Sequence, residues 1–156
     1  MKYYIDTEFD GHNGPLISLA LVPEKREWQD FYFLTTHTGD DIQDPWVREN
    51  VDTIVLDNPN KRCHMHMAHV DHIYKAIRDY LRDITDPIFV ADSPVDIARI
   101  ANILSSDGKN WTPSKFETIT FEVHNVDCYP TTLEGAVQHN AWWDAMALRE
   151  KLNELG

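Results

Sequence analysis

The sequence has few of the residues that mark secreted, zinc-binding or membrane proteins. Its 156 residues include only two cysteines, Cys63 and Cys128, in no CxxC spacing, so neither a disulfide framework nor a zinc site is indicated. No apolar run approaches the length of a membrane span, and no basic-then-apolar signal pattern opens the chain. We therefore expect a cytoplasmic protein with no membrane partner.

Basic residues are the second shortage. Lysine and arginine number 14 against 26 aspartates and glutamates, which gives a formal net charge of −12. Affinity for a phosphate backbone comes mostly from lysine and arginine, so this balance argues against a nucleic-acid partner. Carboxylates that hold divalent cations, however, look negative in a sequence and are less so once loaded. Composition alone therefore leaves the partner open.

The remaining composition fits one folded domain. Hydrophobic residues make up 42% and aromatic residues 11%, which is typical of a globular protein. The length suits one domain with a real core and is too short for two ordinary ones. No internal repeat, low-complexity tract or Gly/Ser linker interrupts the chain, so we expect a single domain over residues 1–156.

Apolar patterns predict strands first and then a mixture of helices and strands. Three apolar runs connected by short turns predict an antiparallel meander, at 3–9, 15–22 and 26–36. Helical periodicity or helix-start signals predict helices at 44–55, 69–84, 93–106 and 140–155. The other segments are expected to form a loop (57–72), a buried strand (87–92), an irregular strand (119–127) and a short helix or turn (131–138). This order predicts an α/β fold, a mixed sheet flanked by helices.

The opening segment, MKYYIDTEFDG, places two acids in an apolar strand. Side chains alternate between the faces of a strand, so Asp6 and Glu8 share one face. Acidic residues are depleted in strands, and two on the same face repel each other. Either this is an edge strand with a solvated polar face, or a cation lies between the two carboxylates.

Two more acids lie beside the apolar stripes of predicted helices. Asp96 stands four residues before Ile100, and Asp144 stands three residues after Ala141. A carboxylate at the border of a core is costly unless it is paired, hydrogen-bonded or bound to metal.

Both acids also have a purely structural explanation. Ser93 and Asp96 fit a capping box, and Asp144 fits a first-turn acid that follows the N-cap Asn140. A lone histidine before a helix, such as His139, is usually polar surface. Judged one at a time, these residues do not decide between structure and chemistry.

Considered together, the acids resemble the motifs of the DEDDh subgroup of the DnaQ-like (RNase H-like) 3′→5′ exonucleases. The family's first motif, DxE, is matched by Asp6 and Glu8. Its second, N-x-x-[FY]-D, aligns with D-S-P-V-D, which puts Asp96 in the catalytic place and Asp92 in that of the asparagine. Its third, H-x-A-x-x-D-A, is matched without gaps by His139, Ala141, Asp144 and Ala145.

The resemblance extends over nearly the whole chain. It is nearest to the short members related to the mycobacterial exoribonuclease, which share a YDTEF-like opening, a PLIS-like second strand and a P/S-W-V-R segment, here 44–48. The second motif departs from the family at Asp92 and Val95. If Asp92 were the ligand in place of Asp96, the number of acids would be kept but the helix phase would change, and we favour Asp96.

The resemblance implies an RNase H-like fold and a two-metal phosphodiesterase. Two Mg²⁺ or Mn²⁺ ions would be held by Asp6, Glu8, Asp96 and Asp144, with His139 as the general base. The implied substrate is the 3′ end of single-stranded RNA or DNA, with RNA favoured by the nearest relatives. A homodimer is compatible with it, since related exonucleases are often homodimers.

Four further residues are candidate substrate contacts. Phe9 follows the first motif, and Trp142 and Trp143 lie within the third. We expect one of the two tryptophans to pack in the core and the other to stack on a terminal base, because aromatic rings stack on bases with little sequence preference. Arg62 precedes a histidine-rich stretch, 64–72, which fits a solvated or substrate-facing loop better than a zinc site.

Two rival functions stay open at this point. One is a DNA-directed exonuclease of the same fold. The other is a catalytically silent member that binds nucleic acid or protein, against which the full acid set and His139 argue, because a binder has no need of a base.

Overall fold

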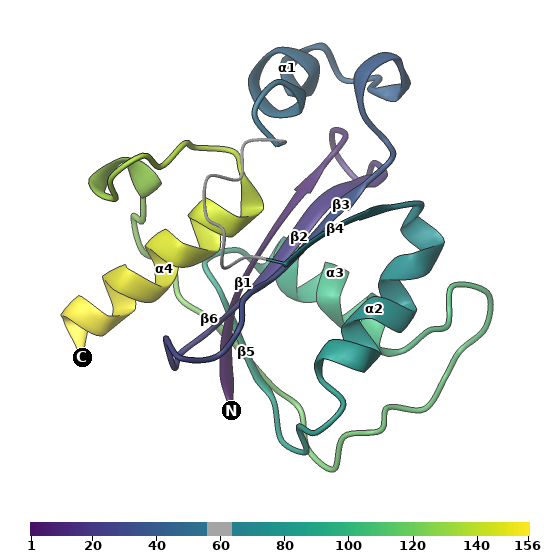
Figure 1. Ribbon diagram of the computed structural model, residues 1–156, viewed down its shortest axis with the longest axis vertical. Helices are drawn as coiled ribbons and strands as arrows, with labels where there is room; N and C mark the ends of the chain where they lie inside the picture. The colour runs from purple at the N-terminus through teal and green to yellow at the C-terminus, as the bar shows by residue number, and fades with distance from the viewer. Residues whose placement is uncertain (56–63) are drawn as a thin grey trace.

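The computed structural model describes residues 1–55 and 64–156, which form a mixed sheet with helices on both faces (Figure 1). The strand order is β4-β3-β2-β1-β5-β6. The strands are β1 (Lys2–Phe9), β2 (Leu16–Pro23), β3 (Phe31–Thr35), β4 (His64–Ala68), β5 (Ile88–Ala91) and β6 (Thr120–Val123). β1, β2 and β3 pair antiparallel as predicted, while β4 joins β3, β5 joins β1 and β6 joins β5 in parallel. The predicted α/β class is confirmed.

The longer helices cover opposite faces of this sheet. Figure 1 shows α4 (Ala141–Leu155) on one side, with α2 (Ile73–Tyr80) and α3 (Pro94–Leu104) on the other. α1 (Pro45–Val47) is a short turn that continues into the π-helical η2 (Arg48–Asp52). Single 3₁₀ turns complete the helical elements: η1 (Gly39–Asp41), η3 (Val70–His72) and η4 (Pro130–Thr132). No described helix combines the length and apolar character needed to cross a bilayer.

β1 divides its side chains between two cores. Tyr3 and Ile5 pack in the cluster formed with α2 and α3, whereas Tyr4 packs in the cluster formed with α4. β1 lies in the middle of the sheet, between β2 and β5. The interpretation of the opening segment as a solvated edge strand is therefore wrong, and the carboxylates of Asp6 and Glu8 need another explanation.

A third core fixes the segment around α1 beyond the end of β1. Val47 and Val51 pack with Ile17 of β2 and Leu34 of β3, together with Ile42 and Val55. Figure 1 shows α1 above the far end of β1 and β2, away from the chain termini. This placement brings a segment 40 residues downstream beside the acids of the first strand.

The histidine-rich stretch differs from the prediction. Residues 64–68 form β4 on the edge of the sheet, where we expected a loop. Its sequence, HMHMA, has no clear apolar alternation, and its strand conformation comes from pairing with β3 rather than from local preference. The predicted strand at 26–36 shortens to β3, at 31–35. The predicted helix at 69–84 becomes the turn η3 followed by the shorter helix α2.

Substitution of Trp142 tests the core between α4 and the sheet. The ring is 1% exposed, and its Nε1–H donates to the Asp30 carboxylate at 2.9 Å. Trp142→Ala removes this packing and should lower the free energy of unfolding by about 3–5 kcal/mol in urea denaturation. Trp111→Ala, at a ring that is 85% exposed, is the control and should stay within about 0.5 kcal/mol of the wild type. Equal effects of the two changes would contradict this packing.

Candidate metal centre and active site

The acids of the first strand lie where the connections of the sheet diverge. After β1 the chain turns to its antiparallel neighbour β2, whereas after β5 it passes through α3 to β6 on the other side. The carboxyl ends of the parallel pair β1 and β5 therefore open a crevice between two departing connections. Open α/β sheets bind ligands at such a switch point.

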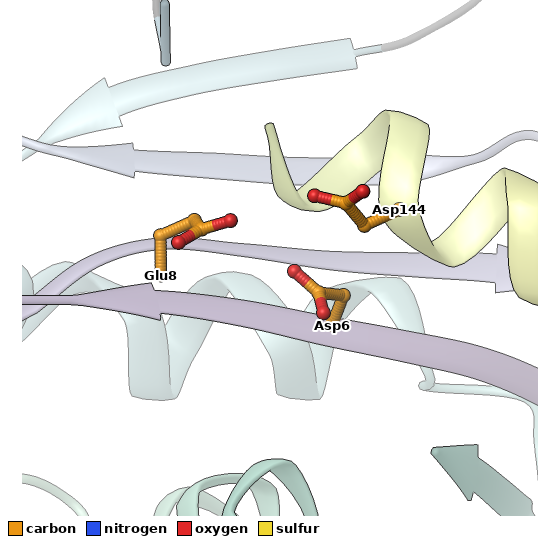
Figure 2. Close-up of side chains that lie close together, drawn as sticks. All are labelled: Asp6, Glu8 and Asp144. Carbon is orange, nitrogen blue, oxygen red and sulfur yellow. The ribbon is translucent and has the colours of Figure 1, made fainter. Parts of the chain in front are cut away.

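Three carboxylates meet on the face of the sheet covered by α4. Asp6 and Glu8 project from β1, and Asp144 projects from the first turn of α4, whose N-cap Asn140 accepts from the N–H groups of Trp142 and Trp143. Figure 2 shows the three side chains directed toward one space. One oxygen from each lies within 4.8 Å of the others, a spacing at which a single cation can bind all three.

Asp96 reaches the same crevice from α3. Its Oδ1 accepts from the N–H of Thr7 at 3.0 Å and also from the Thr7 hydroxyl. Ser93 does cap α3, since its Oγ accepts from the Val95 N–H at 3.2 Å, but Asp96 is turned to β1 rather than back along the helix. The capping-box explanation is therefore correct for Ser93 and wrong for Asp96.

A fifth carboxylate, Asp92, completes a second group. Oxygens of Asp6, Asp92 and Asp96 also lie within 4.8 Å of one another, so Asp6 belongs to both groups. The thiol of Cys128 donates to Asp92 at 3.4 Å. Asp92 and Asp96 are thus neighbours in the site rather than alternatives for one position.

Burial and mutual repulsion make these carboxylates unusually weak acids. Burial, together with the charges of neighbouring acids, raises the pKa of Glu8 to about 8, of Asp144 to about 7 and of Asp96 to about 6. The pKa of Asp6 is raised well above its ordinary value for the same reasons, burial being the largest. The environment disfavours four negative charges, which is the condition that a divalent cation relieves.

Few protein groups compensate for this charge. Across residues 1–55 and 64–156, no lysine or arginine forms an ion pair with any of these four acids. Asp6 Oδ2 is buried and has no hydrogen-bond partner among the described residues. Buried carboxylate oxygens without partners are strongly disfavoured, and oxygen ligands of this kind suit Mg²⁺ and Mn²⁺. The donor set therefore fits hard divalent cations.

His139 lies beside the acids in a strained backbone conformation. Its φ of 62° is in the left-handed region, which a residue with a Cβ adopts at a cost of about 1–3 kcal/mol. It lines the same cleft of about 320 Å³ as Asp6, Glu8, Asp96 and Asp144. Burial lowers the pKa of its imidazole, so the ring is neutral and able to accept a proton at neutral pH.

The structure places the four predicted substrate contacts differently. Phe9 lines the cleft, with the Arg99 guanidinium 4.6 Å from its ring centre. Trp142 and Trp143 are both buried against the sheet, so neither has a free face for a base, and the prediction that one of them stacks is wrong. Arg62 lies outside the described residues.

His69 and His72, in the histidine-rich stretch, do not join the site. Among the described residues, the groups suited to a metal ion consist of acids of the cleft. His69 and His72 are exposed, and His69 Nδ1 lies 3.3 Å from Asp71.

Sequence reasoning missed three residues at the site, Thr7, Trp46 and Tyr129. Thr7 holds Asp96, Tyr129 lines the cleft, and Trp46 contacts His139. Of these three, only Trp46 could have been noticed in the sequence. It directly follows the helix-start pair Asp44-Pro45, where a large aromatic side chain is exposed unless another segment covers it. The other two depend on contacts between distant segments.

No protein-family model matches this chain, and no curated protein matches it.

The raised pKa values predict a metal-free protein that is less stable at high pH. Between pH 4 and 8 the native state holds more protons than the unfolded chain, so the free energy of unfolding falls as pH rises through this range. In EDTA the Tm should fall over this window by about 2–4 °C for each kcal/mol lost. MnCl₂ should restore more of the Tm at pH 8 than at pH 5.

Asp144→Asn is the variant that checks the cause of this pH dependence. It removes one of the repelling charges, so its Tm in EDTA should depend less on pH than that of the wild type. The matched control, Glu154→Gln, changes an exposed carboxylate at the far end of the same helix and should retain the wild-type slope. A wild-type Tm that rises steadily from pH 5 to pH 8 in EDTA would be incompatible with the raised pKa values.

Proposed function

We propose that this protein is a metal-dependent 3′→5′ exonuclease that removes nucleotides from single-stranded nucleic acid. The observation that carries the proposal is the convergence of Asp6, Glu8, Asp96 and Asp144, from three separate elements, on one cleft that also contains a neutral histidine. A core does not require such a set, since each buried carboxylate destabilises the metal-free fold. Two-metal phosphodiester hydrolysis has a use for each part, since acids hold the ions and a base takes the proton of the attacking water.

We also propose that the fold is RNase H-like. Two features support this: the antiparallel β1–β2–β3 start, and the addition of parallel strands β5 and β6 on the other side of β1. They agree with the mixed sheet that the DEDDh resemblance implies. β4 extends the sheet at the β3 edge.

The acids would hold two Mg²⁺ or Mn²⁺ ions. Asp6 belongs to both acidic groups, so it would help to hold both ions, with Glu8 and Asp144 on one side and Asp96, next to Asp92, on the other. When bound, such ions neutralise the scissile phosphate and lower the pKa of water at the site. Thr7 would keep Asp96 in place throughout, because its N–H and hydroxyl donate to the oxygen that faces β1.

His139 would be the general base. Its ring lies in the cleft rather than in the core, and its lowered pKa leaves a nitrogen free to take a proton from the attacking water. His139, with its left-handed backbone, directly precedes Asn140, the N-cap of α4. One short segment thus supplies both the base and, five residues later, the carboxylate of Asp144.

RNA is the favoured substrate, on the resemblance to short exoribonucleases, and a DNA-directed exonuclease is the alternative. A catalytically silent binder is disfavoured, because neither a strained His139 nor four repelling acids would serve binding alone. A homodimer is compatible with this proposal and is decided by light scattering.

Two substitutions separate metal binding from proton transfer. With 5′-labelled single-stranded RNA and DNA in MgCl₂, the wild type should give a ladder that shortens from the 3′ end and disappears in EDTA. Asp6→Ala should lose both Mn²⁺ binding and cleavage. His139→Ala should keep Mn²⁺ binding, measured by calorimetry, and lose turnover by about 10²–10⁴-fold.

Glu154→Gln is the control and should cleave like the wild type, because its carboxylate is exposed and outside the cleft. Internal cleavage, cleavage in EDTA, or full turnover by His139→Ala would each overturn the proposed mechanism.

A further inference from the structure

Asp92 is a fifth acid of the cleft, and it has no role in the chemistry described so far. It directly follows β5 and directly precedes Ser93, the N-cap of α3. Its carboxylate lines the cleft, and one oxygen each of Asp6, Asp92 and Asp96 lie within 4.8 Å of one another. The DEDDh motif has an uncharged asparagine in this place. This chain therefore adds a negative charge on the Asp96 side of the cleft.

The protein contacts of Asp92 do not compensate for this charge. Its hydrogen-bond donor is the thiol of Cys128, at 3.4 Å, and a thiol is a weak donor. Within residues 1–55 and 64–156, no lysine or arginine forms an ion pair with Asp92. After burial, the charge of Asp92 is the largest of the effects that raise the pKa of Asp96 and of Asp144. Asp92 is thus close to acids of both groups and repels them.

Two simpler explanations of Asp92 do not hold. Ser93 already caps α3, because its Oγ accepts from the Val95 N–H at 3.2 Å. A direct contact with the substrate is also excluded by charge, since the proposed substrate brings phosphate groups to this cleft and a carboxylate repels them. A divalent cation is the partner that this charge fits.

We propose that Asp92 is a direct ligand of the ion on the Asp96 side, and that this ion is bound before the substrate arrives. The inference rests on the proposed exonuclease function and adds a ligand to its metal centre. With Asp92, each ion has three carboxylates within reach, because Asp6 belongs to both groups. Without Asp92, the second ion would keep Asp6 and Asp96 and would depend more on the phosphate of the substrate for its remaining oxygen ligands.

An unpartnered oxygen at the centre of the five acids supports two resident ions. Asp6 Oδ2 is buried and accepts no hydrogen bond from the residues that the structure describes. Such an oxygen is strongly disfavoured in the metal-free protein. Because Asp6 is the residue common to both groups, ions bound on its two sides would supply the partner that the protein does not.

Binding of Mn²⁺ without nucleic acid tests this inference independently of cleavage. Isothermal titration calorimetry at pH 8 should give two Mn²⁺ ions per wild-type chain. Asp92→Asn keeps the shape of the side chain and removes its charge. The variant should retain the first ion and bind the second at least about 10-fold more weakly, the lower end of the range for loss of a supporting partner at a metal site.

Thermal unfolding in EDTA separates a metal ligand from a structural residue. Asp92→Asn removes a repelling charge, so its Tm at pH 8 should equal or exceed that of the wild type. If Asp92 mainly held the segment of Cys128 in place, the same change would lower the Tm. Added MnCl₂ should raise the Tm of Asp92→Asn less than that of the wild type.

Asp127→Asn is the matched control, because Asp127 is an exposed acid beside Cys128 that does not line the cleft. It should match the wild type in Mn²⁺ binding and in Tm.

Three results would each overturn the inference. They are unchanged affinity of Asp92→Asn for both ions, a wild type that takes up its second Mn²⁺ only when RNA is present, and a Tm of Asp92→Asn in EDTA below that of the wild type. Failure of the exonuclease proposal looks different. The wild type would then bind two Mn²⁺ ions and leave single-stranded RNA and DNA uncleaved, while the calorimetry would still decide whether Asp92 is a ligand.

Discussion

Repulsion between partly buried carboxylates is the interaction on which the account of this protein depends. Asp6, Glu8, Asp96 and Asp144 are held together by elements whose positions are fixed by apolar cores, and burial, together with the charges of nearby acids, raises the pKa of each. Folding alone gains nothing from this arrangement. A divalent cation reverses the sign of the interaction, because the same four groups then become its ligands. The strongly acidic composition is thus compatible with a phosphate substrate.

The fold imposes this arrangement through β1. Side chains alternate along this central strand, so Tyr3 and Ile5 pack in one core and Tyr4 packs in the other. The acidic residues that follow lie toward the carboxyl end of β1. The neighbouring strand β5 ends at the same edge, and α3 begins there. α4 adds Asp144 because Asn140 starts the helix at this edge. Asp10 then binds the α1 turn to the same strand end. The end of this single strand is therefore the point at which the acids and the α1 turn meet.

Much of the fold could be predicted because its signals are local. Apolar runs gave the first three strands and β5, and caps at Ser93 and Asn140 gave the starts of α3 and α4. β4 could not be predicted, since it is a strand only through its pairing with β3. Among the candidate site residues, the four acids and His139 were predicted from the resemblance of their order and spacing to the DEDDh motifs. The hydrogen bonds from Thr7 to Asp96 and the contact of Trp46 with His139 could not be predicted in this way, because they join residues about 90 positions apart. The prediction that one of Trp142 and Trp143 stacks on a base failed because the helix stripe does not show that the contacts of α4 with the sheet bury both rings.

The most direct test of shared cation binding is the anomalous scattering of a crystal soaked in MnCl₂. The account predicts two Mn²⁺ peaks in the cleft, about 3.5–4 Å apart, with Asp6 in contact with both and Glu8, Asp96 and Asp144 as further ligands. A cleft without anomalous density at saturating Mn²⁺, or one in which lysine or arginine side chains neutralise these acids instead, would contradict it.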